Sequence, residues 1–353
     1  MGLLMKVLVI SGSNIPIPPV LYGGIERQVF NLCKGLSLND YVINLLAVEK
    51  SSNFNGKINF YRKYRYGTSF LGRAINWAEF QFQTLRLLND VDIIHSFLEW
   101  PELHFFLNKV KRPIVYAHQN PLKTNSLKRI LKANPSHGYM QCVSNNHISK
   151  VEVTDPKKAF VTYNCVDTDF FKRQKNVKKE NFLLYLGRLN YEKGIDVAVR
   201  LSQETGVPLK IAGPVRLEEK FSLKLFKERV EPFLSEHIKY LGSVNDLDKR
   251  ILLSKAKALI VPNRWEEPFG LMNAEALACG TPIIATNKGS LKEIILNGKT
   301  GFLCDNYGEL SEAIRNVDYL SRKFCRADAI KRFSLKTYIN QTEKIYKKIL
   351  GDF

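Results

Sequence analysis

The stretch WEEPFGLMNAEALACGTP, residues 265–282, predicts a helix with a marked beginning and end. Pro268 suits the first turn of a helix, and Gly280 suits the residue just past its end. Apolar runs at 258–261 and 282–286 flank the stretch and predict two buried strands. A strand–helix–strand order of this kind is typical of a parallel α/β sheet.

The start of this predicted helix has the features of a ligand site. The N–H groups of Phe269, Gly270 and Leu271 would point outward from the helix N-terminus, and Gly270 has no side chain to block an approaching anion. Glu275 lies about two turns after Glu267, so both carboxylates can flank one ligand. Carboxylates would repel a phosphate, so we expect them to accept hydrogen bonds from the hydroxyls of a sugar ring and a ribose. The alternative to a ligand site is that Glu275 is an ordinary helix carboxylate and that Glu267 is an acidic residue that the helix dipole favours at the N-terminus.

Two cations follow another apolar run, residues 182–187. Arg188 comes directly after that run and Lys193 precedes the next helical segment, so both are expected at the carboxyl end of a parallel sheet, where ligands bind. An arginine fork and a lysine point charge suit a diphosphate and can stabilise it as it leaves. Two solvated surface cations are the alternative.

Strand and helix patterns alternate along all 353 residues, which predicts two α/β domains. We place the domains at residues 1–166 and 167–334, followed by a terminal helix at 335–353 that packs back on the first domain. The stripe of this helix consists of Tyr338, Thr342, Ile345, Tyr346 and Ile349. The other expected strands are 6–11, 42–48, 92–95, 114–118, 138–143, 209–212, 238–241 and 301–304; the other expected helices are 25–38, 195–204, 217–233 and 246–255.

Composition excludes several classes of protein. No apolar run approaches the roughly 18–20 residues that a membrane-spanning helix needs. Six scattered cysteines without a C-x-x-C pair indicate a reducing cytoplasm and argue against a zinc site or a disulfide framework. The formal net charge of +19 would attract polyanions, such as nucleic acid, anionic lipid or pyrophosphate-linked substrates.

Residues 265–282 resemble the Glu-x7-Glu signature of the family-four retaining glycosyltransferases, with the usual Ala-Cys-Gly-Thr-Pro continuation. The resemblance covers nearly the whole chain, through segments 22–27, 186–194, 240–244 and 297–302. It implies an α/β protein with two Rossmann-like domains facing a central cleft, the glycosyltransferase-B architecture. Two departures are Cys165, where the family often has glycine, and Asn263-Arg264 in place of a commoner Pro-Ser-like pair. We expect neither departure to carry chemistry.

The resemblance implies a retaining transfer of a hexose-type sugar from a nucleotide-diphosphate sugar to a glycan or lipid-linked acceptor, in cell-surface polysaccharide or glycoconjugate synthesis. We expect a UDP-sugar first and a GDP-sugar second, with no cofactor. Arg188 and Lys193 can neutralise the charge that a metal would otherwise neutralise, so no metal is expected. The predicted catalytic residues are Glu267, Arg188, Lys193 and His118. The predicted donor-binding residues are Gly24, Arg188, Lys193, Gly242, Phe269, Gly270, Leu271 and Glu275.

Two of these residues lie in the first half of the chain. Gly24 lies immediately before a predicted helix. The loop that precedes this helix lacks the G-x-G-x-x-G pattern of dinucleotide-binding proteins, which disfavours a nicotinamide dehydrogenase. We expect Gly24 to approach the donor's phosphate or sugar, although a tight turn would also explain it. His118 ends the strand expected at 114–118, where the family often has a histidine near the transferred sugar. We favour a substrate contact over a structural role for it.

Residues 61–86 mix cations with aromatic side chains. We expect a cytoplasmic enzyme that docks on the inner face of an anionic membrane through residues 61–86 and 123–132. Trp77, Phe80 and Leu87 are spaced like the buried face of a helix. The same mixture could stack single-stranded bases, but a nucleic-acid partner is disfavoured because no recognition motif is present. A glycosyltransferase or binding protein with a nucleic-acid acceptor, and a non-catalytic sugar-nucleotide-binding scaffold, remain the alternatives.

Overall fold

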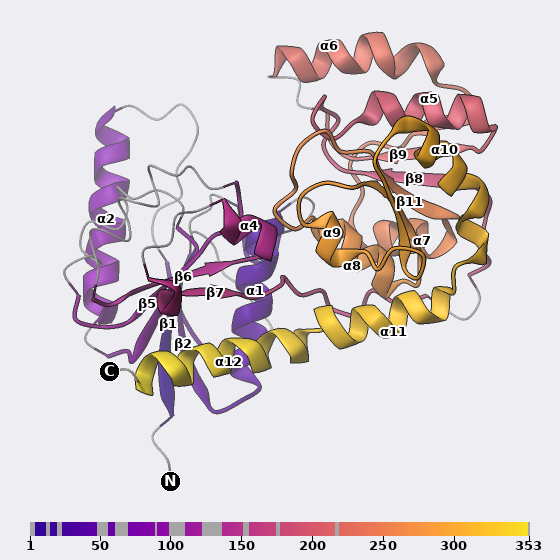
Figure 1. Cartoon of the computed structure of the whole chain (residues 1–353). Helices are drawn as coiled ribbons and strands as arrows, with labels where there is room; N and C mark the ends of the chain where they lie inside the picture. The colour runs from indigo at the N-terminus through magenta and orange to yellow at the C-terminus, as the bar shows by residue number, and fades with distance from the viewer. Residues whose placement is uncertain are drawn as a thin grey trace. The chain divides into compact units, whose positions relative to one another are not determined.

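The chain divides into two compact units in the computed structural model (Figure 1). Unit 1 consists of Met1–Asn164 with Leu335–Phe353, and unit 2 consists of Cys165–Ser334. The structure describes residues 4–11, 15–19, 23–47, 56–60, 70–88, 90–98, 110–121, 136–150, 155–173, 177–215 and 219–351. Residues 61–69 and 123–132 of the predicted membrane contact therefore lie outside the described residues.

Unit 1 is built on a parallel sheet whose strand order is β3-β2-β1-β4-β5-β6-β7. The strands are β1 (Met5–Ile10), β2 (Tyr41–Ala47), β3 (Lys57–Phe60), β4 (Ile93–Ser96), β5 (Ile114–Ala117), β6 (Gly138–Cys142) and β7 (Ala159–Val161). Val9 of β1 pairs with Leu45 on one side and with His95 on the other. Because β1 lies inside the sheet, residues 7–10 are buried on both faces, and all four are apolar.

Helices cover both faces of this sheet. They are α1 (Gly24–Ser37), α2 (Phe70–Leu88), the short α4 (Asn145–Ser149) and α12 (Leu335–Gly351), with a 3-10 turn η3 (Pro156–Lys158). Phe80 of α2 packs in one cluster with Leu8 and Ile10. On α12 the whole predicted stripe is buried, which confirms it. Helix α12 contacts α1 at Gly35, where a Cβ atom would lie 2.3 Å from Ile339, so only glycine permits this approach.

Unit 2 repeats the architecture with the strand order β10-β9-β8-β11-β12-β13. The strands are β8 (Leu183–Leu186), β9 (Leu209–Ala212), β10 (Ile238–Tyr240), β11 (Ala258–Val261), β12 (Ile283–Thr286) and β13 (Gly301–Cys304), all parallel. The helices are α5 (Ile195–Thr205), α6 (Lys220–Arg229), α7 (Asp246–Lys255), α8 (Leu271–Ala278), α9 (Leu291–Ile294), α10 (Tyr307–Asn316) and α11 (Arg322–Phe333), with 3-10 turns η4 (Glu231–Phe233) and η5 (Val317–Tyr319).

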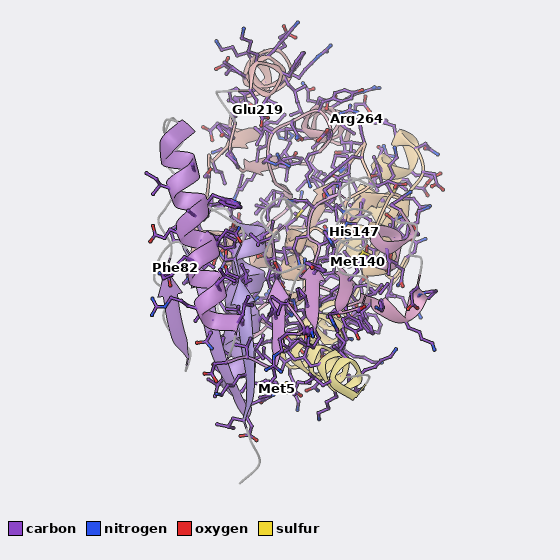
Figure 2. All side chains as sticks on the ribbon, turned by 90° about the vertical axis from the view of Figure 1, so that its left-hand side faces the viewer. Met5, Phe82, Met140, His147, Glu219 and Arg264 are labelled. Carbon is purple, nitrogen blue, oxygen red and sulfur yellow. The ribbon has the colours of Figure 1, made fainter. Side chains whose placement is uncertain are left out.

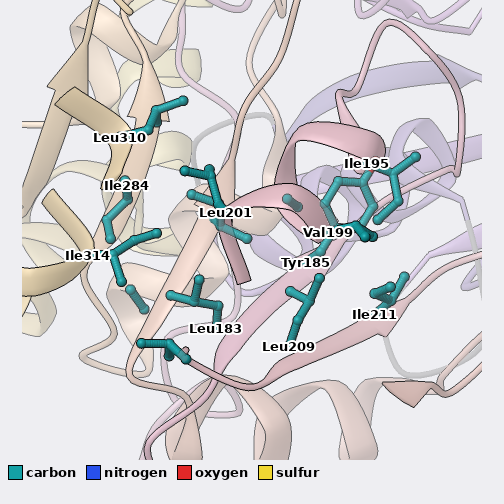
Figure 3. Close-up of a cluster of buried hydrophobic side chains, with 14 of the residues drawn as sticks. Leu183, Tyr185, Ile195, Val199, Leu201, Leu209, Ile211, Ile284, Leu310 and Ile314 are labelled. Atoms are coloured by element: carbon teal, nitrogen blue, oxygen red, sulfur yellow. The ribbon is translucent and has the colours of Figure 1, made fainter. Parts of the chain in front are cut away.

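A hydrophobic core of unit 2 lies between this sheet and helices α5 and α10 (Figure 3). Leu183 and Leu209 contribute from neighbouring strands, Leu201 from α5 and Ile314 from α10. These side chains are fully or almost fully removed from water. Burying each one contributes about 1.5–3 kcal/mol, so this core fixes the sheet edge on which the candidate site is built.

The prediction of two parallel α/β Rossmann-like domains is confirmed. Strands β3 and β7 were not predicted, and both are edge strands, short and without a long apolar run. The helix expected at 217–233 is shorter, since α6 ends at Arg229 and a 3-10 turn follows. Trp77 is 40% exposed, so the prediction that it is a core residue is wrong, because Phe80 and Thr84 form the buried side of α2.

Candidate functional site

Most of the predicted site residues follow the ends of two adjacent strands in unit 2. Strand β8 has β9 on one side and β11 on the other, so the direction of winding changes between β8 and β11. Crevices at such a change are the usual ligand sites of open α/β sheets. Arg188 follows β8 by two residues, and Asn263 follows β11 by two residues. The fold therefore brings the loop 187–194 and the loop 262–270 to one position.

Gly270 caps the N-terminus of α8 in a conformation that favours glycine, with φ of 78°. A Cβ atom there would lie 2.6 Å from the amide of Asn273 and 3.1 Å from Cγ of Glu267. Within the described part of the chain, the N–H groups of Gly270 and Leu271 donate no backbone hydrogen bond. The helix N-terminus thus has unsatisfied donors, which are suited to an oxygen-rich ligand.

Lys193 forms a buried ion pair with Glu267 beside this helix start. Both side chains are 10% exposed. The amide of Asn263 donates to Oε2 of Glu267 at 3.1 Å, and Lys193 binds the same oxygen. The Lys193 ammonium also lies 4.9 Å from the ring centroid of Trp265. Oε1 of Glu267 accepts no hydrogen bond from the described residues, so one oxygen of this carboxylate remains for a ligand hydroxyl.

Arg264 connects the two loops through hydrogen bonds. Its guanidinium donates to Asp196 of α5 in a bidentate pair at 2.7 and 2.6 Å, and to the carbonyl of Tyr191 at 2.8 Å. The hydrogen bonds to Asp196 raise the pKa of Arg264 above its ordinary value. Gly194 lies against the carbonyl of Pro262, 2.0 Å from the position of a Cβ atom, so no side chain fits there. These contacts hold Lys193 against Glu267.

Ser290 fixes the backbone around Glu267 from a third loop. Its N–H donates to the carbonyl of Glu267 at 3.0 Å, and its hydroxyl donates to the carbonyl of Phe269 at 3.1 Å. Gly289 has φ of 55°, and a Cβ atom there would lie 2.7 Å from the Glu267 nitrogen. Phe269 itself is buried against Phe333, with ring centroids 5.7 Å apart. Its predicted role in donor binding therefore concerns its backbone.

Glu275 has a different cation as its partner. Its Oε1 accepts from the ammonium of Lys249 on α7 at 2.6 Å, and its side chain is only 3% exposed. Lys249 also reaches Asp246 at 3.1 Å and lies 4.9 Å from the ring centroid of Phe171. Because a buried carboxylate without a partner is costly, Lys249 is what stabilises the charge of Glu275.

Arg188 differs from Lys193, since it has no ion pair within the described residues. Its Nε is buried and has no hydrogen-bond partner there. The hydroxyl of Tyr185 donates to the Arg188 carbonyl at 3.0 Å, which orients the backbone at this point. Burial, reinforced by the Glu267 and Asp196 carboxylates, raises the pKa of Tyr185, so this phenol stays neutral and remains a donor.

Gly242 follows β10, with φ of 69° and open space where a Cβ atom would be. Next to it, Gly213 donates to the Gly242 carbonyl at 2.8 Å. A Cβ atom on Gly213 would lie 1.9 Å from the carbonyl oxygen of Gly187. Glycines thus follow β8, β9 and β10 in turn and leave the carboxyl edge of this sheet uncovered by side chains at these positions.

Gly24 and His118 belong to unit 1. Gly24 opens α1 and is exposed. The glycine that packing requires is its neighbour Gly23, since a Cβ atom there would lie 2.6 Å from Pro19 and 2.7 Å from a Glu26 carboxylate oxygen. His118 follows β5, is buried, and donates its backbone N–H to the Gln141 carbonyl at 2.9 Å.

Three contributors to the site were not predicted, namely Asn263, Lys249 and Ser290. Asn263 was expected to carry no chemistry, yet it binds Glu267 directly. The sequence did offer a sign of this role. Asn263 replaces a residue that is commoner in the family, and it lies two positions after a buried strand, at the sheet edge where the other site residues lie. Lys249 and Ser290 come from separate elements, and no local pattern marks them.

No helix among the described residues is long and apolar enough to cross a membrane. The described residues also contain no group of three or more His, Cys, Asp or Glu side chains placed to hold a metal ion. Among the described residues, the charged groups of the site are the pairs Lys193–Glu267, Lys249–Glu275 and Arg264–Asp196, together with Arg188.

Comparison with known proteins identifies the family of unit 2. Residues 166–324 match the family model described as glycosyl transferases group 1. An uncharacterised glycosyltransferase of Methanocaldococcus jannaschii is 25% identical over 372 aligned positions, which cover 98% of this chain and 99% of that protein. Glycogen synthase of Mycobacterium tuberculosis is 36% identical over 142 positions, 38% of this chain and 33% of that enzyme.

A solved structure extends the likeness to the fold of both units. The crystal structure of HepE from Anabaena in complex with UDP and glucose matches with a TM-score of 0.76 at 18% identity, covering 97% of this chain and 99% of that one. We conclude that residues 166–324 form a domain of the glycosyl transferases group 1 family, in a chain that has the two-domain fold of glycosyltransferase-B enzymes.

Proposed function

We propose that this protein is a retaining glycosyltransferase. It transfers a hexose-type sugar from a nucleotide-diphosphate sugar to a glycan or lipid-linked acceptor, in the synthesis of a cell-surface polysaccharide or glycoconjugate. The observation that carries the proposal is the buried Lys193–Glu267 pair beside the uncapped N-terminus of α8, with Glu275 in the same helix. A protein that used this surface only for folding would not need helix N–H groups and a carboxylate oxygen that no described residue satisfies.

Each group has a role that follows from its chemistry. Glu275 accepts hydrogen bonds from the ribose, and Glu267 with the amides of 269–271 binds hydroxyls of the transferred sugar. Arg188 and Lys193 bind the diphosphate, where a fork and a point charge neutralise the oxygens that gain charge as the glycosidic bond breaks. Gly242 leaves room for the donor, and Gly24 and His118 contact it from unit 1.

The reaction needs no nucleophile from the protein. The C1–O bond to the diphosphate breaks, and its electron pair leaves with the phosphate. The acceptor hydroxyl attacks C1 on the same face, and its proton moves to the leaving phosphate oxygen, so the anomeric configuration is retained. Because two cationic side chains stabilise the leaving group, we propose that transfer is independent of metal ions.

We propose UDP as the nucleotide, with GDP second. HepE, which shares the fold, has been crystallised with UDP and glucose and with UDP-glucose. The test is a thermal-shift and hydrolysis screen with UDP-, GDP- and ADP-sugars, repeated with excess chelator. We expect one UDP-sugar to raise the melting temperature and to be hydrolysed slowly in both conditions, with the anomer read by NMR. If no nucleotide sugar binds, the proposed function is wrong. If the chelator abolishes turnover and Mg²⁺ or Mn²⁺ restores it, transfer depends on a metal ion.

We further propose that unit 1 docks on an anionic membrane through α2, where a lipid-linked acceptor would be found. Ile75, Phe82 and Leu85 are exposed along one side of this helix, and Phe82 is 59% exposed. Phe82 is labelled on α2 in Figure 2. The Arg86 guanidinium lies 5.8 Å from the Phe82 ring centroid. Apolar side chains with an adjacent cation, on a chain with a net charge of +19, suit the interface of an anionic bilayer.

A further inference from the structure

Two lysine–carboxylate pairs in unit 2 share one geometry. Lys193 and Asn263 both bind Oε2 of Glu267, and Lys249 binds Oε1 of Glu275. In each pair the second carboxylate oxygen accepts no hydrogen bond from the described residues. A lysine, unlike an arginine fork, binds one oxygen and leaves the other with its lone pairs available.

Lys249 is itself held in place from three sides. Its ammonium contacts Asp246 at 3.1 Å, Glu275 at 2.6 Å and the face of Phe171 at 4.9 Å from the ring centroid. The side chain is 18% exposed, and Phe171 is buried. A cation fixed between two carboxylates and a ring has little freedom to move, so it also fixes the rotamer of Glu275.

We infer that Lys249 is a positioning residue for nucleotide recognition. It binds Oε1 of Glu275, holds this nearly buried side chain in place, and so presents Oε2 as the acceptor for a ribose hydroxyl. This inference rests on the proposed function, in which Glu275 binds the ribose. It predicts that removing Lys249 weakens binding only of those nucleotides that have ribose hydroxyls.

The experiment compares UDP with 2′,3′-dideoxyuridine diphosphate by calorimetric titration. For the wild type we expect UDP to bind about tenfold more tightly, the effect of one charged hydrogen bond. For Lys249→Met we expect this preference to disappear, with the affinity for the dideoxy nucleotide unchanged. Lys249→Arg keeps a cation beside Glu275 and should restore part of the preference. The matched control is Lys255→Met, which removes a lysine of the same helix that pairs with Glu180 instead, at 2.8 Å.

A second comparison covers the case in which Lys249→Met does not fold, since it leaves a buried carboxylate unpaired. Glu275→Gln and the double variant Glu275→Gln/Lys249→Met remove that charge, and both should bind UDP equally, because Lys249 acts through Glu275. If the double variant binds UDP several-fold more weakly, Lys249 contacts the nucleotide itself and the inference is wrong. Equal loss of both nucleotides in Lys249→Met would indicate a merely structural role. If Glu275→Gln binds UDP like the wild type, the ribose role proposed for Glu275 fails instead.

Discussion

Asn263 donates to the same oxygen of Glu267 that Lys193 binds, so the two donors together fix the direction of this carboxylate. We expect Asn263→Ala to lower kcat/KM for the donor about fivefold, because one hydrogen bond contributes about 1 kcal/mol. The measurement is initial-rate kinetics together with the melting temperature. Asn287→Ala is the matched control, since Asn287 donates to Asp305 at an exposed position. Wild-type kinetics in Asn263→Ala would mean that Lys193 alone suffices.

Arg188 has a buried Nε that finds no partner among the described residues, whereas Lys193, Lys249 and Arg264 are paired with carboxylates. A ligand phosphate would satisfy that donor. We expect Arg188→Ala to weaken binding of the nucleoside diphosphate by about 1.5–3 kcal/mol, as measured by calorimetric titration. Arg200→Ala removes an exposed cation that pairs with Glu204, and it should bind like the wild type. Equal binding by the two variants would remove Arg188 from the proposed site.

The sequence pattern singled out Glu267 and Glu275, but it did not single out the residues that contact them. The pattern around Glu267 and Glu275 is local, because spacing along one helix and a Pro–Gly start are visible in the chain itself. Lys249 and Ser290 reach the same residues from α7 and from the loop before α9. Contacts of this kind depend on the packing of elements that are distant in sequence, and a single sequence carries no local signal for them.

Helix α11 stabilises the C-terminal ends of three other helices at once. Arg322 donates to carbonyls of Ser254 and Ala256 at the end of α7, and Arg326 donates to Ala278 at the end of α8. Arg332 donates to Glu293 and Ile294 at the end of α9. Carbonyls at helix ends lack partners within their own helix, and a cation there also interacts favourably with the helix dipole. Through Arg326, α11 therefore fixes the position of α8, the helix that carries Glu275.

Arg326→Ala should consequently destabilise unit 2. Arg326 donates to Ala278 at 2.6 Å, to Phe171 at 3.1 Å and to Thr168 at 3.2 Å. Loss of these charged hydrogen bonds should lower the free energy of unfolding by about 2–4 kcal/mol. Urea denaturation is the measurement, and Lys323→Ala, an exposed position on the same helix, is the control. A loss below about 0.5 kcal/mol in Arg326→Ala would show that water replaces the arginine at these carbonyls.

Helix α11 was not predicted, in contrast to α12. The side chains that α11 uses for packing are largely arginines, so an apolar stripe is weak, and Cys325, Ala329 and Phe333 are spread over three turns. Helix α12 has six buried positions in one stripe, and its periodicity is clear. Helices that pack through long polar side chains are therefore missed by hydrophobic periodicity alone.

His95 links α12 to the sheet of unit 1 and makes its stability depend on pH. Nδ1 of His95 lies 2.7 Å from the hydroxyl of Tyr346, and burial lowers the pKa of His95 to about 3. The unfolded chain therefore binds a proton below about pH 6.5 that the folded chain does not bind, so stability is lost as the pH falls below that value. Between pH 7 and pH 5 this single group should cost about 2 kcal/mol of unfolding free energy.

The His95→Gln variant isolates this effect. Urea denaturation at pH 7 and pH 5 should show a smaller loss on acidification in His95→Gln than in the wild type, by about 2 kcal/mol. His237→Gln, at a partly exposed position in unit 2, should lose as much as the wild type. An identical pH dependence in all three proteins would mean that His95 becomes protonated without unfolding unit 1.

The net charge of +19 is a property of the whole molecule, and it is compatible with two kinds of partner that no single contact distinguishes. An anionic membrane and a nucleic acid both attract such a protein, and both interactions weaken with salt. The exposed apolar side of α2 distinguishes them, because burying Phe82 and Leu85 in a lipid interface adds a contribution that salt does not screen.

We therefore expect flotation with vesicles that contain phosphatidylglycerol at low salt, and much less with phosphatidylcholine alone. High salt should reduce binding without abolishing it, since the apolar contribution remains. Phe82→Ser/Leu85→Ser should remove that salt-resistant fraction, whereas Phe221→Ser, which changes a 90% exposed aromatic side chain on α6, should not. A gel-shift assay with single-stranded RNA and DNA runs in parallel. Tight, salt-sensitive binding of nucleic acid without a preference for anionic vesicles would overturn the membrane proposal, because charge alone would then explain every interaction of this surface.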